Sequence, residues 1–138
     1  MAEKKASAKT RQIQNYMTKS VITLPKTVKV SSAARLMAER VISCIVIVDN
    51  STKPIGIITE RDIVRRILFA NIDPKTKKLD DVMSSPVITA APDVDMSAAI
   101  KTMQKNRIRR LPIVDKEGKL VGLVTQTDLF KGVIALGL

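Results

Sequence analysis

The sequence contains no histidine and no tryptophan, and its single cysteine is Cys44. Nucleophilic catalysis by Ser/His/Asp or Cys/His arrangements needs a histidine, and zinc sites need histidines or several cysteines. A disulfide within one chain needs two cysteines. The 13 Asp and Glu residues are scattered and suggest no general acid facing a general base. We therefore expect no enzyme activity, no catalytic residue, no metal site and no required cofactor.

Aromatic residues and long hydrophobic runs are also scarce. The aromatic residues are Tyr16, Phe69 and Phe130, too few for a base-stacking platform that binds single-stranded nucleic acid. No apolar run approaches the roughly 20 residues that span a bilayer. The basic N-terminus is not followed by an apolar stretch of the signal-peptide type. We expect a cytoplasmic protein that does not associate with membranes.

What the sequence does contain is enough apolar material for a folded core. Of its 138 residues, 45% are hydrophobic and 27% are charged, which is typical of a globular protein. This length predicts one domain, or two very small ones that share a core.

The charge is strongly basic, with 24 Lys and Arg against 13 Asp and Glu and a net charge of +11. The excess is concentrated near the N-terminus and in one later segment. The residues are Lys4, Lys5, Lys9, Arg11 and Lys19, then Lys101, Lys105, Arg107, Arg109 and Arg110. This pattern is consistent with an anionic partner and equally with a solubilising surface.

The chain is an internal duplication. Residues 16–64 align with residues 82–130 without a gap, at a constant offset of 66 residues. We predict a basic N-terminal arm (1–12), a first repeat (13–70), a polar linker (71–78) and a second repeat (79–138). A repeat of this size hides its apolar surface poorly alone, so we expect the two to pack about a pseudo-twofold axis.

Each repeat shows the same order of predicted elements, β-α-β-β-α, which indicates the α+β class. The predicted strands are 21–23, 44–48 and 55–58, then 87–89, 111–114 and 120–124. Apolar residues at helical spacing predict a first helix in each repeat, with Thr27 and Asp93 as candidate N-caps. Closing helices are predicted at about 60–70 and 126–136. Each repeat is thus expected to hold a three-stranded sheet covered by two helices.

The repeated strings resemble the CBS domain family, in the tandem arrangement called a Bateman module. The strings are Tyr16-Met17-Thr18 and Val82-Met83-Ser84, Ile45–Asp49 and Leu111–Asp115, and Gly56–Asp62 and Gly122–Asp128. Two ordered sets at one fixed offset make the resemblance specific, and it spans roughly residues 13–136. It implies a regulatory module that binds adenine nucleotide (AMP, ADP, ATP) or S-adenosylmethionine in clefts between the repeats and signals by conformational change.

The residues at the end of each repeat suit such a ligand. Thr59 with Asp62, and Thr125 with Asp128, place a hydroxyl and a carboxylate together, which fits the adjacent hydroxyls of a ribose. The same Thr-x-x-Asp spacing also forms a helix capping box, in which both side chains only satisfy backbone N–H groups. We favour ribose binding because the two aspartates occupy equivalent places.

The resemblance implies further contacts, in which each pocket takes its ribose contact from one repeat and its base wall from the other. One pocket would join Ser20, Val21, Ile42 and Ser43 to Leu123, Thr125 and Asp128. The other would join Pro86, Val87, Ile108 and Arg109 to Ile57, Thr59 and Asp62. Phosphate would be held by Arg109 and Arg110, with Arg61 assisting. Because Ser43 stands where the second repeat has Arg109, we expect unequal pockets.

We expect a homodimer that signals to an unidentified effector protein. Ile63, Ile67 and Ala70, with Leu129, Val133 and Leu136, are expected to leave apolar surface on the closing helices that a second copy covers. The alternative is a basic DNA- or RNA-binding protein with vestigial nucleotide clefts, in which the N-terminal arm tracks phosphates.

Overall fold

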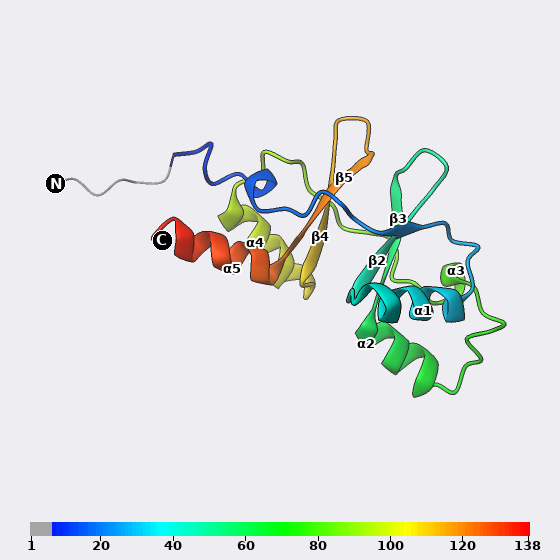
Figure 1. Cartoon of the computed structure of the whole chain (residues 1–138). Coiled ribbons are helices and arrows are strands. Elements are labelled where there is room, and N and C mark those ends of the chain that lie inside the picture. Colours follow the sequence, from blue (N-terminus) through cyan, green and yellow to red (C-terminus); the bar gives the residue numbers. More distant parts are fainter. Residues whose placement is uncertain (1–6) are drawn as a thin grey trace. The chain divides into compact units, whose positions relative to one another are not determined.

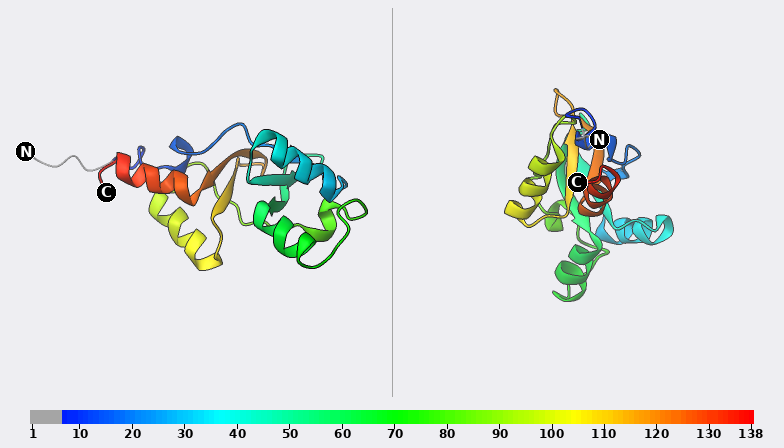
Figure 2. Two further views of the ribbon diagram at one scale, coloured as in Figure 1. Left: turned by 60° about the horizontal axis from the view of Figure 1, so that its bottom comes forward. Right: turned by 90° about the vertical axis from the view of Figure 1, so that its left-hand side faces the viewer.

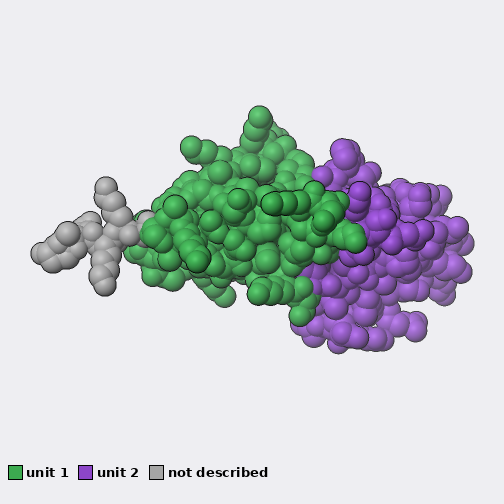
Figure 3. Space-filling view, turned by 90° about the horizontal axis from the view of Figure 1, so that it is seen from above, with its two compact units in different colours: residues 1–20, 88–138 green, residues 21–87 purple. Residues whose placement is uncertain are grey.

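The computed structural model describes residues 7–138 and divides the chain into two compact units (Figure 3). Unit 1 combines the N-terminal residues through Ser20 with residues 88–138, and unit 2 is residues 21–87. Lys4 and Lys5 of the predicted arm lie outside the described residues. No helix within residues 7–138 has the length and apolar character needed to cross a membrane.

Unit 2 holds a three-stranded sheet in the order β1-β2-β3. Strand β1 (Thr23–Leu24) pairs in parallel with β2 (Cys44–Val48), which pairs antiparallel with β3 (Pro54–Thr59). Helix α1 (Val30–Arg40) precedes β2, and the closing helix consists of α2 (Glu60–Asp62) and the π-helical η2 (Ile63–Leu68). The short helix α3 (Leu79–Val82) completes the unit (Figure 1).

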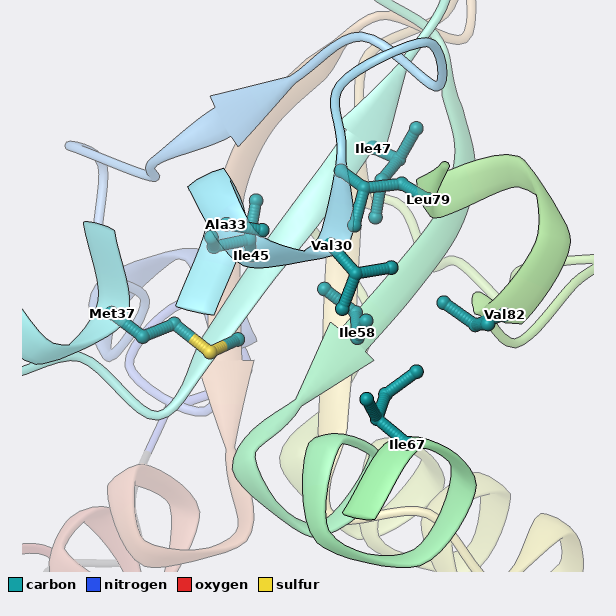
Figure 4. Packing of buried hydrophobic residues seen from close by; sticks show 9 residues of the cluster. All are labelled: Val30, Ala33, Met37, Ile45, Ile47, Ile58, Ile67, Leu79 and Val82. Atoms are coloured by element: carbon teal, nitrogen blue, oxygen red, sulfur yellow. The ribbon is translucent and has the colours of Figure 1, made fainter. Parts of the chain in front are cut away.

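One buried cluster lies between this sheet and its helices. Figure 4 shows its nine residues, which are Val30, Ala33, Met37, Ile45, Ile47, Ile58, Ile67, Leu79 and Val82. The apolar spacing of the first helix is confirmed, since Val30, Ala33 and Met37 all enter this core.

Unit 1 repeats the arrangement with a reduced sheet. Strand β4 (Arg110–Val114) pairs antiparallel with β5 (Leu120–Thr125). Helices α4 (Met96–Asn106) and α5 (Gln126–Ala135) lie side by side (Figure 2), and the 3-10 helix η1 (Ile13–Asn15) joins their core. In place of a third strand there is one parallel bridge, between Ala90 and Ile113. The α+β class is confirmed, but the strand predicted at 87–89 does not form.

The opening segments of the two repeats are exchanged. Residues 12–18, which begin the first repeat, pack in unit 1 with the helices of the second. Residues 78–84, which begin the second repeat, pack in unit 2 with the helices of the first. Ile13 and Leu79 are the equivalent apolar residues, and both are 0% exposed.

The hydrogen bonds of the exchanged segments match pair by pair at the 66-residue offset. Ile13 N donates to Val94 O at 2.9 Å, and Leu79 N donates to Val28 O at 2.9 Å. A two-way bridge joins Thr18 to Leu123, and its counterpart joins Ser84 to Ile57.

Two glycines allow these segments to approach. A Cβ added at Gly122 would run into the side chain of Met17, and one at Gly56 would run into Met83. A larger residue at either glycine would therefore require the other repeat's opening methionine to shift.

Neither predicted N-cap of the first helices is correct. Helix α1 follows Lys29, which makes no side-chain cap, and its first N–H groups donate to Lys77 O and Pro74 O at 2.9 Å each. Helix α4 is capped by Asp95, which accepts from Ser97 N at 2.9 Å. Carbonyl groups of the predicted linker accept from the first N–H groups of α1, and this contact is distant in sequence. The local pattern of polar residues placed both predicted caps too early.

An ion pair fixes the start of α4. Arg11 Nε and Nη2 donate to the two carboxylate oxygens of Asp95 at 2.8 and 3.1 Å. Hydrogen bonding to Arg11 is the largest cause that lowers the pKa of Asp95 to about 2. In unit 2 the equivalent positions are Lys77 and Lys29, two like charges that cannot form this pair. The N-terminal segment is therefore anchored by a contact that only unit 1 possesses.

We expect Asp95→Asn to make the free energy of unfolding less dependent on pH under acidic conditions. The carboxyl group titrates at about 3.9 when unfolded and at about 2 when folded. Its ionised form therefore stabilises the fold above about pH 4, and this contribution is lost as the pH falls towards 2. Urea unfolding at several pH values should show the wild-type advantage over Asp95→Asn shrinking across this window, while Asp93→Asn serves as the exposed control. A wild-type advantage that does not change with pH would contradict the assignment.

Candidate functional site

Both Thr-x-x-Asp motifs form complete capping boxes. In unit 2, Thr59 N donates to Asp62 Oδ2 at 2.9 Å and Asp62 N donates to Thr59 Oγ1 at 3.2 Å. In unit 1, Thr125 N donates to Asp128 Oδ2 at 2.9 Å and Asp128 N donates to Thr125 Oγ1 at 3.1 Å. The capping interpretation that the sequence left open is therefore realised in both repeats.

Capping leaves much of each side chain's hydrogen-bonding capacity unused. An ionised carboxylate offers about four lone-pair sites, and the box occupies Oδ2 of each aspartate with one backbone N–H. The threonine hydroxyls act as acceptors in the box, so their protons can still be donated. Capping holds the carboxylates in place and leaves Oδ1 to accept hydrogen bonds from a ligand, so the two roles are compatible.

Strand alternation places the threonines on the face of each sheet that is opposite the helical core. Ile58 and Val124 belong to the core clusters, and neighbouring residues of a strand point to opposite faces. The residues on either side of them, which share the opposite face, are Ile57 and Thr59 in β3 and Leu123 and Thr125 in β5. The predicted ribose threonine and one predicted base-wall residue thus lie two positions apart on the same face.

The residues that precede the central strands lie beside the capping boxes. Glu60 N donates to Ser43 O at 2.9 Å, and Gln126 N donates to Arg109 O at 2.8 Å. Ile42 and Ile108 come immediately before, each with its N–H bonded to the last turn of the preceding helix. Within a unit, Ser43 is therefore next to Thr59, and Arg109 is next to Thr125.

Four further predicted residues lie where the chain passes between the units. Ser20 ends the first part of unit 1 and Val21 begins unit 2, while Pro86 and Val87 close unit 2. Within each unit, the structure therefore brings together the capping-box threonine and aspartate, the base-wall residue two positions before the threonine, and the residue that precedes the central strand. Their combination into clefts that join the two repeats stays a prediction.

The cations predicted to hold phosphate differ in their surroundings. Arg61 and Arg109 are exposed, and Arg110 is half-buried. Arg110 is the direct cross-strand partner of Thr125, and the corresponding partner of Thr59 is Cys44. Their phosphate contacts stay a prediction.

Sequence reasoning missed a cation at the Asp62 carboxylate. Arg66 Nε lies 3.8 Å from Asp62 Oδ1, and Arg66 Nη1 donates to Val82 O at 2.8 Å. Aspartate and arginine at i and i+4 of a helix are neighbours, so this spacing could have revealed the pair. The equivalent position in unit 1 is Gly132.

The apolar residues exposed on the closing helices differ largely from those predicted. The prediction is wrong for Ile67 and Leu129, which are in the cores, while Ile63, Val133 and Leu136 pack partly against the cores and Ala70 is exposed as predicted. The large apolar side chains exposed on or beside these helices are Val64, Leu68 and Phe69 in unit 2 and Phe130, Ile134 and Leu138 in unit 1. A hollow of about 250 Å³, which includes Val64 and Met37 in its lining, adjoins this surface in unit 2.

Comparison with known proteins identifies the repeated unit. The CBS domain family model matches residues 12–69 and 79–135. An uncharacterised protein of Methanopyrus kandleri is 42% identical over 113 residues, which are 82% of this chain and 58% of that protein. The inosine-5'-monophosphate dehydrogenase of Methanocaldococcus jannaschii is 39% identical over 121 residues, which are 88% of this chain and 23% of the dehydrogenase. The chain thus spans less than two thirds of each of these relatives.

A solved structure shows the same fold with adenosine compounds. It is the CBS domain pair of protein MJ0100 in complex with 5'-methylthioadenosine and S-adenosyl-L-methionine. It is 30% identical to this chain, with a TM-score of 0.77, and the match covers 87% of this chain and 97% of that one.

We expect Asp128→Ala to lower the free energy of unfolding by about 0.5–1.5 kcal/mol, because the N–H of the N-cap residue Thr125 loses the carboxylate that accepts from it. Asp128→Asn keeps an oxygen that can accept from Thr125 N and should cost less. Urea unfolding at neutral pH without ligand measures both variants, with Asp93→Ala as the control. Wild-type stability in Asp128→Ala would show that the box does not stabilise the helix.

Proposed function

The chain belongs to the CBS domain family and carries two copies of the domain, and from this premise we propose that it is a regulatory module that binds an adenosine-containing ligand. The ligand class is adenine nucleotide (AMP, ADP or ATP) or S-adenosylmethionine. The observation that carries the proposal is the pair of capping-box aspartates, each held rigidly with an oxygen that capping does not use.

In this proposal the carboxylates of Asp62 and Asp128 accept hydrogen bonds from the ribose hydroxyls. Hydrogen bonds to an ionised acceptor are stronger than those between neutral groups. The capping N–H groups already order each carboxylate, so less conformational entropy is lost when a ligand binds. Thr59 and Thr125 can add a donated hydroxyl proton. The adenine would pack against aliphatic side chains such as Ile57 and Leu123, which stand on the same sheet faces as the threonines.

The proposed activity is binding without chemistry on the nucleotide. The sequence has no Gly-x-x-x-x-Gly-Lys-Ser/Thr loop to cradle phosphates for transfer. The dehydrogenase relative is matched over 23% of its length, so its enzyme name does not extend to this chain. Occupancy would act on an effector protein through a conformational change, which requires different ligand affinities in two states.

The basic charge keeps nucleic acid as an alternative partner, but one cation of the proposed arm is already engaged. Arg11 is bound to Asp95 and is therefore not available to track phosphates. Salt dependence separates the two functions, because polyanion binding weakens steeply between low and moderate ionic strength.

We expect AMP, ADP, ATP or S-adenosylmethionine to raise the melting temperature. A ligand at 100 times its dissociation constant stabilises a fold by about 2.7 kcal/mol. Asp62→Asn and Asp128→Asn should each reduce the shift and the double variant should abolish it, while Asp93→Asn keeps the full shift. The 2'-deoxy analogue of the active ligand should give a smaller shift because it lacks one ribose donor.

Two outcomes would contradict this proposal in different ways. If none of the compounds shifts the melting temperature, adenosine binding is wrong. If a compound stabilises the double variant as much as the wild type, the ligand binds elsewhere and the aspartates only cap their helices.

We also propose that two copies of the chain pair through the exposed apolar residues of the closing helices. Leu68→Glu with Phe130→Glu would place charges in the buried contact and should convert a dimer to a monomer in size-exclusion chromatography with light scattering. Val41→Glu changes another highly exposed apolar residue, one that is not part of the closing helices, and is the matched control. A wild-type protein that is monomeric at all concentrations would refute the pairing.

A further inference from the structure

We propose that Arg66 makes the two ribose carboxylates unequal, so that Asp128 binds an adenosine ligand more tightly than Asp62 does. This inference rests on the proposed function and assigns a specificity-determining residue to it. It starts from a charged difference at the aspartates of the two capping boxes, where Arg66 of unit 2 is replaced by Gly132 in unit 1.

Both oxygens of Asp62 have neighbours in unit 2. Oδ2 accepts from Thr59 N at 2.9 Å, and Oδ1 lies 3.8 Å from Arg66 Nε. The guanidinium is held in this place by its other end, where Nη1 donates to Val82 O at 2.8 Å. The cation is thus fixed beside the carboxylate by a backbone contact that does not involve Asp62.

The Asp128 carboxylate in unit 1 has no equivalent of Arg66. The ion pairs described within the units join Arg11 to Asp95 and Arg66 to Asp62, and neither involves Asp128. The position that matches Arg66 is Gly132, and a Cβ there would lie 3.0 Å from two ring carbons of Tyr16 and 3.1 Å from Met96 Cε. A side chain at this position would therefore require Tyr16 or Met96 to shift, so the packing of unit 1 disfavours an equivalent of Arg66.

The consequence for a ribose follows from the number of acceptor sites. Two adjacent ribose hydroxyls that donate to one carboxylate need lone pairs that capping does not use. In unit 2 these lone pairs include those of Asp62 Oδ1, the oxygen beside Arg66. The ligand must share Oδ1 with the guanidinium or displace it, whereas Oδ1 of Asp128 accepts without competition. The Arg66 side chain is 46% exposed, so water can solvate the guanidinium after a ligand displaces it. The loss of ligand affinity at Asp62 is therefore that of breaking a surface ion pair, roughly two- to five-fold.

Single-site proteins test this ranking with adenosine, which carries no phosphate that Arg66 could attract. Asp62→Asn leaves the Asp128 site, and Asp128→Asn leaves the Asp62 site. Calorimetric titration should give the lower dissociation constant for Asp62→Asn. Adding Arg66→Gln to Asp128→Asn should tighten adenosine binding about two- to five-fold, and adding it to Asp62→Asn should change nothing.

Two features of the design separate charge from folding. Glutamine keeps a donor for Val82 O, so Arg66→Gln retains the contact that anchors this side chain. Arg65→Gln removes the same charge from an exposed neighbour on the same helix, and it should leave both dissociation constants unchanged.

The inference is overturned if Asp128→Asn binds adenosine as tightly as Asp62→Asn, or if Arg66→Gln has no effect or the same effect in both backgrounds. These results would leave adenosine binding itself intact. A wild-type protein that binds no adenosine compound would instead refute the proposed function, and this inference with it.

Discussion

The exchange of opening segments is the constraint on which the rest of the fold depends. Ile13 and Leu79 are fully buried in the core of the repeat to which they do not belong in sequence. Burying an aliphatic side chain of this size is worth about 1.5–3 kcal/mol, and each segment adds backbone hydrogen bonds that its own repeat does not receive. A single repeat, cut at its sequence boundaries, would lack part of its core and the partners of its first helix. The duplication is therefore stable as a pair rather than as two independent domains.

The exchanged segments also touch the helices that carry the capping-box carboxylates, Asp62 and Asp128. In unit 2, Arg66 joins the helix of Asp62 to Val82, at the end of α3. In unit 1, the ring of Tyr16 packs against Gly132 on the helix of Asp128. Tyr16 and Val82 are equivalent residues, so both units make this connection at the same point. Each carboxylate thus lies one contact away from a segment that continues directly into the other unit.

Sequence periodicity and the fixed offset were sufficient for the parts of the fold that are determined locally. They predicted β2 correctly, offered the capping box as the alternative interpretation of both Thr-x-x-Asp motifs, and identified the core face of α1 through Val30 and Met37. They failed where distant segments decide the outcome. The N–H groups of α1 are satisfied from the linker, and the predicted strand at 87–89 is reduced to a bridge at Ala90. The outer face of the closing helices was misjudged because helical spacing shows an apolar stripe without showing which side the core occupies.

The two repeats keep apolar residues in their cores and differ in charge around the capping boxes. A core residue is constrained by close-packed neighbours, so Met37 and Met103 or Ile47 and Ile113 remain identical. A residue at the margin of the capping box has fewer neighbours. At these margins the alignment pairs Ser43 with Arg109, Cys44 with Arg110 and Arg66 with Gly132. Duplication therefore supplies two similar frameworks, and substitutions at their margins make the surroundings of the two capping boxes unequal without loss of fold. Under the proposed function, two carboxylate sites that fill at different ligand concentrations would extend the range over which one chain can respond.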